Sequence, residues 1–172
     1  TTVERLAKLR PAFKDASQGG TVTAGNACTM GDAAGAILFT TREHAKAIGA
    51  NILFSVVSSA EAAVEPKTMG DGPSVSIPLA LKRANLSLDD MDFIEVNEAF
   101  AAQMLANERE LQWDRDKLNV WGGAIALGHP TGFTGVRLLM TLDNILRSND
   151  GELGVAGICG GGGVTTAMVI RR

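Results

Sequence analysis

Residues 92–103 read DFIEVNEAFAAQ and join two elements of regular structure. The apolar run from Phe93 to Val96 predicts a short buried strand. The polar pair Asn97–Glu98 then opens a helix that we expect to reach about Leu111. The polar pair therefore lies at the carboxyl end of a strand, where the functional sites of α/β folds collect.

Two further polar motifs follow apolar stretches in the same way. Gly128-His129-Pro130 comes after an apolar, glycine-containing stretch, and Cys159 is followed by four consecutive glycines, Gly160 to Gly163. Parallel strands of one sheet bring their carboxyl ends to the same region of the fold. The pattern therefore predicts that all three motifs meet in one site.

The rest of the chain alternates between strands and helices. Apolar and β-branched runs predict strands at the end of 33–41 and at 52–58, 118–121, 154–159 and 164–170. Apolar periodicity and terminal signals predict helices at 3–9, 42–50, 73–85 and 132–147. This order indicates an α/β layered domain, and the scarcity of polar residues in the strands predicts helices on both faces of the sheet.

The composition limits the class of protein. The 172 residues are 45% hydrophobic and 20% charged and carry a net charge of −3, which is typical of a globular protein and argues against a nucleic-acid binder. No apolar stretch reaches the roughly 18 residues of a membrane span. Two cysteines, two histidines and no CxxC motif predict neither a disulfide scaffold nor a structural metal site. We expect free thiols in a reducing compartment, the cytoplasm, with mitochondria or peroxisomes as alternatives.

Each motif also has a purely structural interpretation. A histidine before proline is common in loops, a buried cysteine is often a small core residue, a glycine run fits a hairpin, and asparagine is a good N-cap. The combination is harder to explain in this way. Thiol, imidazole, carboxamide and glycine N–H groups can move protons and stabilise an oxyanion. They predict acyl or enolate chemistry without a metal.

Three stretches resemble the C-terminal signature blocks of thiolases: VNEAFAAQ (96–103), NVWGGAIALGHPTG (119–132) and ICGGGG (158–163). The stretches GTVTAGNAC (20–28) and EPKTMGDGP (65–73) resemble the same family in order and spacing. The resemblance covers nearly the whole chain, and the three blocks together are highly specific. It implies a thiolase-like layered domain with a mixed five-stranded sheet covered by helices on both faces. It places the end of a loop domain and a lead-in at 1–32 and the C-terminal domain at 33–172.

The resemblance implies a two-step acyl transfer on CoA thioesters, in which a cysteine from an N-terminal half carries the acyl group. His129 matches the histidine that activates this nucleophile and helps to hold the thioester oxygen. Cys159 matches the second cysteine, which moves the α-proton. Asn97 matches the asparagine that positions a water in one oxyanion hole, and Gly161 matches the glycine whose N–H joins the other.

Weaker matches concern the pantetheine arm of CoA. Cys28 stands where the family usually has a serine, and Met69 and Phe100 match apolar residues of the same pocket. Phe133 replaces a small residue close to the histidine, so we expect the acyl pocket to differ. None of these departures removes a catalytic group.

The family's nucleophilic cysteine has no counterpart here, because Cys28 lies in a different block. The chain is therefore expected to be a C-terminal fragment or a split subunit that is inactive alone. Its expected partners are an N-terminal thiolase half, acetyl-CoA and 3-ketoacyl-CoA as substrates, and further copies in a dimer or tetramer. No permanently bound cofactor is expected.

The alternative is a non-catalytic thiolase-like subunit that binds lipid or acyl-CoA or acts as a scaffold. Lineages of that kind tend to lose the NEAF block or the histidine, and this chain keeps both. Decarboxylating ketoacyl synthases share the superfamily fold but usually have two histidines at these positions, so Cys159 argues against them.

Overall fold

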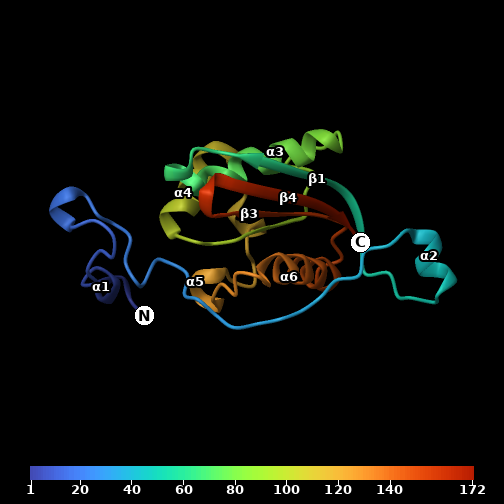
Figure 1. Ribbon diagram of the computed structural model, residues 1–172, viewed down its shortest axis with the longest axis horizontal. Coiled ribbons are helices and arrows are strands. Elements are labelled where there is room, and N and C mark those ends of the chain that lie inside the picture. Colours follow the sequence, from blue (N-terminus) through green and yellow to red (C-terminus); the bar gives the residue numbers. More distant parts are fainter.

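A mixed sheet forms the centre of the computed structural model, which describes residues 1–172. The strands lie in the order β1-β4-β3-β2. Their bounds are β1 (Ser55–Ala63), β2 (Phe93–Val96), β3 (Leu153–Cys159) and β4 (Val164–Arg171). β4 pairs antiparallel with both β1 and β3, whereas β2 pairs parallel with β3. Figure 1 shows β1, β3 and β4 as the middle layer.

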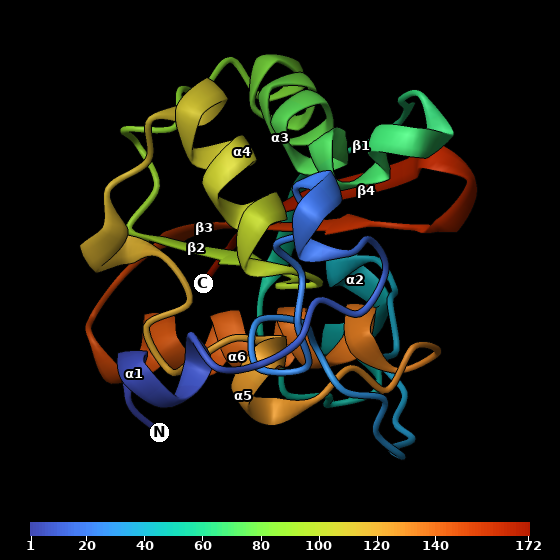
Figure 2. The same cartoon turned by 90° about the vertical axis from the view of Figure 1, so that its left-hand side faces the viewer.

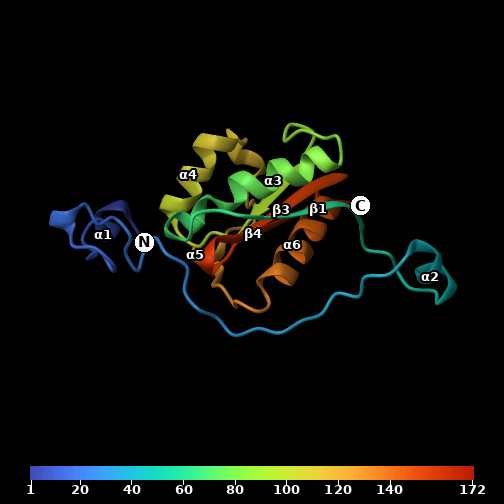
Figure 3. The ribbon, with the colours of Figure 1, turned by 45° about the horizontal axis from the view of Figure 1, so that its top comes forward.

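Helices cover both faces of this sheet, as predicted. α3 (Gly72–Arg83) and α4 (Ala101–Leu111) lie on one face and α6 (Thr134–Ser148) on the other (Figures 1 and 3). The remaining helices are short: α1 (Val3–Leu6), α2 (Arg42–Ala47) and α5 (Ala124–Leu127). Single 3₁₀ turns span Ala16–Gln18, Pro66–Asp71, Arg115–Lys117 and Gly161–Gly163. None of the helices has both the length and the apolar character needed to cross a bilayer.

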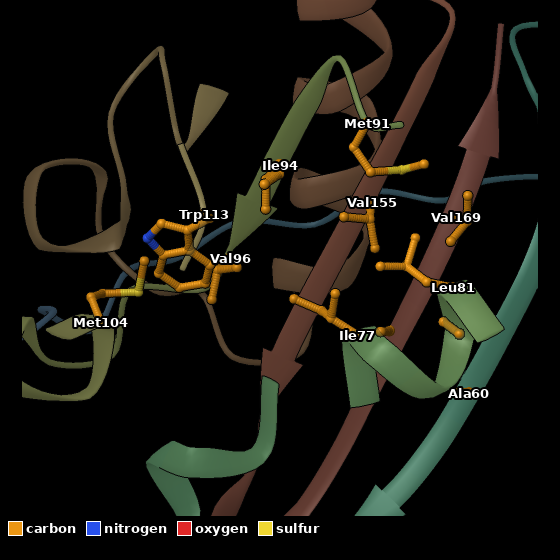
Figure 4. Packing of buried hydrophobic residues seen from close by; sticks show 12 residues of the cluster. Ala60, Ile77, Leu81, Met91, Ile94, Val96, Met104, Trp113, Val155 and Val169 are labelled. Carbon is orange, nitrogen blue, oxygen red and sulfur yellow. The ribbon is translucent and has the colours of Figure 1, made fainter. Parts of the chain in front are cut away.

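Two apolar clusters hold the layers together. In the first, side chains of α3 such as Ile77 and Leu81 pack on Val155 and Val169 of the sheet (Figure 4). In the second, Leu138, Leu142 and Leu146 of α6 pack on Ala156 and Ile170 from the opposite face. Neighbouring strand residues point to opposite faces. A strand that is covered on both faces must therefore be apolar throughout, which explains the pattern of β3.

The sheet has four strands, so the expected fifth strand is wrong. Leu118 makes only an isolated bridge to Ile94 in place of the strand predicted at 118–121. The segment 33–41 is extended but forms no strand, and its Leu38 and Phe39 are 79% and 53% exposed. An apolar run becomes a strand only where another strand offers its N–H and C=O groups. The segment 33–41 has no such neighbour in this chain. At 118–121, the Asn119 side chain accepts from the Val96 N–H at 2.8 Å and donates to the Val96 carbonyl oxygen at 3.0 Å, and so occupies the backbone groups that a paired strand would use.

Residues 1–50 lie against the outside of the layered body. They pass beneath α6 as a long strap between α1 and α2 (Figure 3). Ala45 is the only buried residue among them. The division at residues 32 and 33 that the sequence suggested stays a prediction.

We predict that Leu142→Ala lowers the free energy of unfolding by about 2–5 kcal/mol, because the side chain is fully buried between α6 and the sheet. Urea unfolding measures this loss. Met140→Ala is the matched control, because Met140 lies on the same helix and is 42% exposed. It should change stability by less than about 0.5 kcal/mol. Equal losses in the two variants would contradict the packing.

Candidate active site

An extended segment, residues 26–30, connects two of the three predicted motifs. The Cys28 N–H donates to the carbonyl oxygen of Ala99 at 2.9 Å, and the His129 N–H donates to the carbonyl oxygen of Thr29 at 2.7 Å. Cys28 is therefore held between the loop after β2 and the loop that carries His129. Figure 2 looks onto this end of the molecule, where the N-terminal segment in blue passes between α4 and α5.

The same segment explains why α4 begins later than predicted. The sequence suggested a helix from Asn97, but α4 starts at Ala101. The Ala101 N–H donates to the carbonyl oxygen of Asn26 at 2.9 Å. Phe100 keeps extended backbone angles, φ −145° and ψ 142°, and forms a bridge with Ala27. This pairing with residues 26–28 uses backbone groups that a longer helix would need.

Asn97 and Cys159 lie at the ends of adjacent parallel strands. The Asn97 N–H donates to the carbonyl oxygen of Gly157 at 3.0 Å, two residues before Cys159. The structure thus brings together Asn97 and Cys159 through the sheet, and Cys28 and His129 through the segment 26–30. They lie at one edge of the sheet, as the positions of the three motifs predicted.

The Asn97 side chain is buried, and its Oδ1 atom has no hydrogen-bond partner. Leaving a buried polar atom unpaired costs about 1–3 kcal/mol. Such atoms in native structures call for a water, an ion or a functional explanation. The carboxamide is therefore placed to bind a small polar molecule at the strand end.

The hydrogen bonds of His129 determine which ring nitrogen carries the proton. Its Nδ1 atom lies 2.7 Å from Oγ1 of Thr134, and that hydroxyl donates to the carbonyl oxygen of Pro130 at 3.0 Å. A hydroxyl has one proton, so Thr134 accepts from the Nδ1–H of the neutral ring. The lone pair is then on Nε2. Burial, and next the charge of Arg137, lower the pKa of His129, which favours this neutral form.

Both cysteines are free thiols. Burial raises the pKa of Cys159, and the charge of Cys28 raises it further, while a backbone hydrogen bond lowers it. Burial likewise raises the pKa of Cys28, opposed by a backbone hydrogen bond, and the charge of Glu98 adds to the rise. Both groups are therefore protonated at neutral pH. A protonated thiol can give up a proton, and the neutral ring of His129 can accept one.

The glycine turn after Cys159 needs glycine for steric reasons. Gly163 has φ 87°, and a side chain there would collide with the carbonyl oxygen of Val64. Gly161 is exposed, with open space where a side chain would stand, and its N–H takes part in no backbone hydrogen bond. The turn therefore presents an unused N–H group directly after the thiol.

Met69 and Phe100 are half-buried on two different elements. Met69 lies in the 3₁₀ turn Pro66–Asp71, which Asn107 of α4 anchors through a 2.8 Å hydrogen bond to the carbonyl oxygen of Gly70. Phe100 lies next to Ala27 and packs edge-to-face on Phe13 with 6.2 Å between the ring centroids. Phe100 is thus adjacent to Cys28.

Comparison with known proteins identifies the family. A family model described as the thiolase C-terminal domain matches residues 50–172, and one described as the thiolase N-terminal domain matches residues 1–43. The chain belongs to the thiolase family.

Individual thiolases resemble it along its whole length. The acetyl-CoA acetyltransferase of Pseudomonas aeruginosa is 49% identical over 172 residues, which is 100% of this chain and 43% of that protein. Acetyl-CoA acetyltransferase 1 of Arabidopsis thaliana is 43% identical over 97% of this chain and 40% of that protein. The crystal structure of human mitochondrial 3-ketoacyl-CoA thiolase in complex with CoA has a TM-score of 0.95 and 47% identity over 99% of this chain and 43% of that chain. The chain thus spans less than half the length of these thiolases.

Several residues near this site could not be recognised from the sequence. Glu98 accepts a 3.0 Å hydrogen bond from the Ile125 N–H at the start of α5, and a side chain on Gly123 would collide with its carboxylate. Gly123 therefore has to be a glycine to leave room for the Glu98 carboxylate. The sequence offered Glu98 only as a helix cap. In the sequence, nothing distinguishes Thr134, the hydrogen-bond partner of His129, from other residues in the first turn of a helix.

Two buried charged residues were missed as well. Glu95 of β2 is completely buried and pairs with Arg137 of α6, with 3.2 Å between Oε2 and Nη1. In the sequence, Glu95 is one acidic residue inside an apolar run, and Arg137 is one of several arginines. The chain holds no cluster of three or more His, Cys, Asp and Glu side chains that could bind a metal ion.

We predict that Thr134→Val removes the preference of His129 for the Nδ1–H form. The methyl group keeps the volume but cannot accept the Nδ1–H hydrogen bond. ¹⁵N NMR of the ring should show the Nδ1–H population falling, and the free energy of unfolding should drop by about 1–3 kcal/mol. Thr141→Val on the same helix is the control and should leave the ring signals unchanged. An unaltered tautomer in Thr134→Val would refute the assignment.

A second prediction concerns Glu95, whose pKa burial raises from 4.5 to about 7, against the opposing charge of Arg137. The folded chain binds this proton more tightly than the unfolded chain, so the associated stability is lost as the pH rises from about 5 to about 8. The loss should be on the order of 2–3 kcal/mol. Urea unfolding at several pH values measures it. Glu95→Gln should flatten the dependence, and identical slopes in the two proteins would show that Glu95 is not its source.

Proposed function

We propose that this chain is the C-terminal part of a thiolase that catalyses reversible CoA-dependent acyl transfer. The reaction cleaves a 3-ketoacyl-CoA with CoA, or runs backwards as a Claisen condensation. One observation carries the proposal: backbone hydrogen bonds through residues 26–30 and the end of β2 connect the loop of His129 with the end of β3. The first carries a neutral ring with Nε2 free, and the second carries the protonated Cys159 thiol. The relatives named acetyl-CoA acetyltransferase support the same class of reaction.

In the first half-reaction, His129 takes the proton of a cysteine supplied by the N-terminal part. The resulting thiolate attacks the 3-keto carbon, and the bond between C2 and C3 breaks. Its electron pair passes to the enolate of acetyl-CoA, and Cys159 delivers its proton to C2. The products are acetyl-CoA and an acyl group on the N-terminal cysteine. His129 is then charged and Cys159 is a thiolate.

The second half-reaction restores both groups. The Cys159 thiolate takes the proton of CoA, and the CoA sulfur attacks the acyl carbon. The N-terminal cysteine leaves as a thiolate and recovers the proton from His129. The protons balance because each residue ends in the state in which it began.

Two sites support the oxyanions of these steps in our proposal. The unpartnered Oδ1 of Asn97 accepts a hydrogen bond from a water molecule. That water and His129 then donate to one oxyanion and stabilise it. The free N–H of Gly161 belongs to the second site. Cys28, Met69 and Phe100 contact the pantetheine arm of the CoA substrates, which is consistent with their half-buried positions around the same edge.

Assembly with an N-terminal thiolase part, and with further copies as a dimer or tetramer, completes the proposal. The exposed Leu38 and Phe39 support it, as does a cavity of about 830 Å³ that these residues line together with Met140 of α6. Such apolar surface is typical of an interaction site. The free thiols support a location in the cytoplasm.

Co-expression tests the proposal and its non-catalytic alternative, a subunit that only binds acyl-CoA. The chain is combined with the part of the Pseudomonas aeruginosa enzyme that precedes the matched region, and CoA-dependent loss of acetoacetyl-CoA is measured. The assembled protein should turn over, and Cys159→Ala or His129→Ala should lower the rate by about 10²–10⁴-fold. His44→Ala, on the exposed helix α2, is the control and should retain the rate. Assembly and acyl-CoA binding without turnover, or an undiminished rate in Cys159→Ala, would reject the catalytic roles.

A further inference from the structure

Arg137 and Thr134 occupy the same face of α6, because residues three apart on a helix are neighbours. Thr134 is the hydrogen-bond partner of His129 Nδ1. The Cα–Cβ bond of a helical residue tilts towards the N-terminus of the helix, here towards Thr134, and the charge of Arg137 lowers the pKa of His129. The N-terminal end of a helix also carries a partial positive charge, which acts on the ring in the same sense.

The guanidinium is buried and anchored on one side only. Its side chain is 13% exposed, and Nη1 pairs with the fully buried Glu95 at 3.2 Å. Its Nε and Nη2 atoms, and Oε1 of Glu95, are buried without a hydrogen-bond partner. The positive charge therefore lies in a medium that screens it less than water does.

Arg137 of α6 is the charged group whose field lowers the pKa of His129. The charges of Glu95 of β2 and of Glu98 in the following loop act on Arg137 in turn. Glu98 also acts on Cys28 of the segment 26–30, and Cys28 acts on Cys159 of β3. Both thiols have raised pKa values and are uncharged at neutral pH. Burial raises the pKa of Glu95 to about 7, so in mild acid this residue becomes neutral and no longer offsets Arg137. The positive charge of Arg137 is then least compensated in the pH range in which His129 would otherwise take up a proton.

We propose that Arg137 is a positioning residue that keeps His129 neutral: its guanidinium, fixed by Glu95 one helical turn after Thr134, opposes formation of the imidazolium. The importance of this effect for catalysis rests on the proposed function, whereas the effect on the ring does not. Glu95 is the anchor, and its own protonation strengthens the effect as the pH falls.

Titration of the 172-residue chain by NMR tests the proposal, because the chain has two histidines and His44 on the exposed helix α2 provides an internal reference. In Arg137→Gln, the titration midpoint of the His129 ring should move to higher pH. In Arg137→Lys, which keeps the charge, the midpoint should stay close to that of the unaltered chain. Arg147→Gln is the matched control, because Arg147 lies on the same helix and pairs with Asp143. An unchanged midpoint in Arg137→Gln, or an equal shift in Arg147→Gln, would overturn the proposal.

Removing Arg137 alone leaves the Glu95 carboxylate buried and unpaired, which can prevent folding. The double variant Glu95→Gln/Arg137→Gln replaces both charges by neutral amides of similar shape. An upward shift of the His129 midpoint in this protein supports the proposal, and an unchanged midpoint rejects it.

Activity of the chain assembled with an N-terminal part separates this inference from the proposed function. The acid limb of the pH–rate profile should move to higher pH in Arg137→Gln. In Arg137→Lys it should lie at the same pH as in the unaltered protein. A purely structural role would lower the rate at all pH values without moving this limb. Should the assembled unaltered protein show no turnover, the proposed function fails, while the NMR titration still decides the role of Arg137.

Discussion

The parallel pairing of β2 with β3 is the constraint on which the candidate site depends. The register places Val96 opposite Gly157, so both strands end at the same edge and deliver Asn97 and Cys159 side by side. A slip by one residue would turn every side chain of β2 to the other face and would bury Asn97 away from the thiol. The apolar clusters on both faces of the sheet hold this register, because buried residues of β2, β3 and β4 pack with side chains of α3, α4 and α6.

Burial gives the site its chemical character. A low-dielectric surrounding disfavours charge on an imidazole and on a thiol alike, so it leaves one group ready to accept a proton and the other ready to donate one. The two residues need no direct ion pair to reach these states. Thr134 selects the ring nitrogen that stays free, and Arg137 adds a fixed positive charge from the same helix. Support for the reacting groups thus comes largely from the first turns of α6.

Some groups of the chain remain without partners at or near its surface. The apolar segment 33–41 remains without a pairing strand, and the outer side of α6 keeps the buried Oδ1 of Asp143 unpaired. In folded proteins, backbone groups and buried polar atoms normally have hydrogen-bond partners. Both features are consistent with a chain that spans about 43% of the length of the thiolases it matches.

Local sequence determined the layered α/β class, the four strands of the sheet, the main helices and the three motifs, because apolar periodicity and glycine turns depend on neighbouring residues. It could not determine that 33–41 and 118–121 fail to become strands, since pairing requires a partner elsewhere in the chain. Nor could it show that residues 26–28 delay the start of α4, or that Thr134, Glu98, Glu95 and Arg137 surround the reacting groups. Hydrogen bonds and charges act across distances in space, and only the tertiary structure decides which distant residues come within that range.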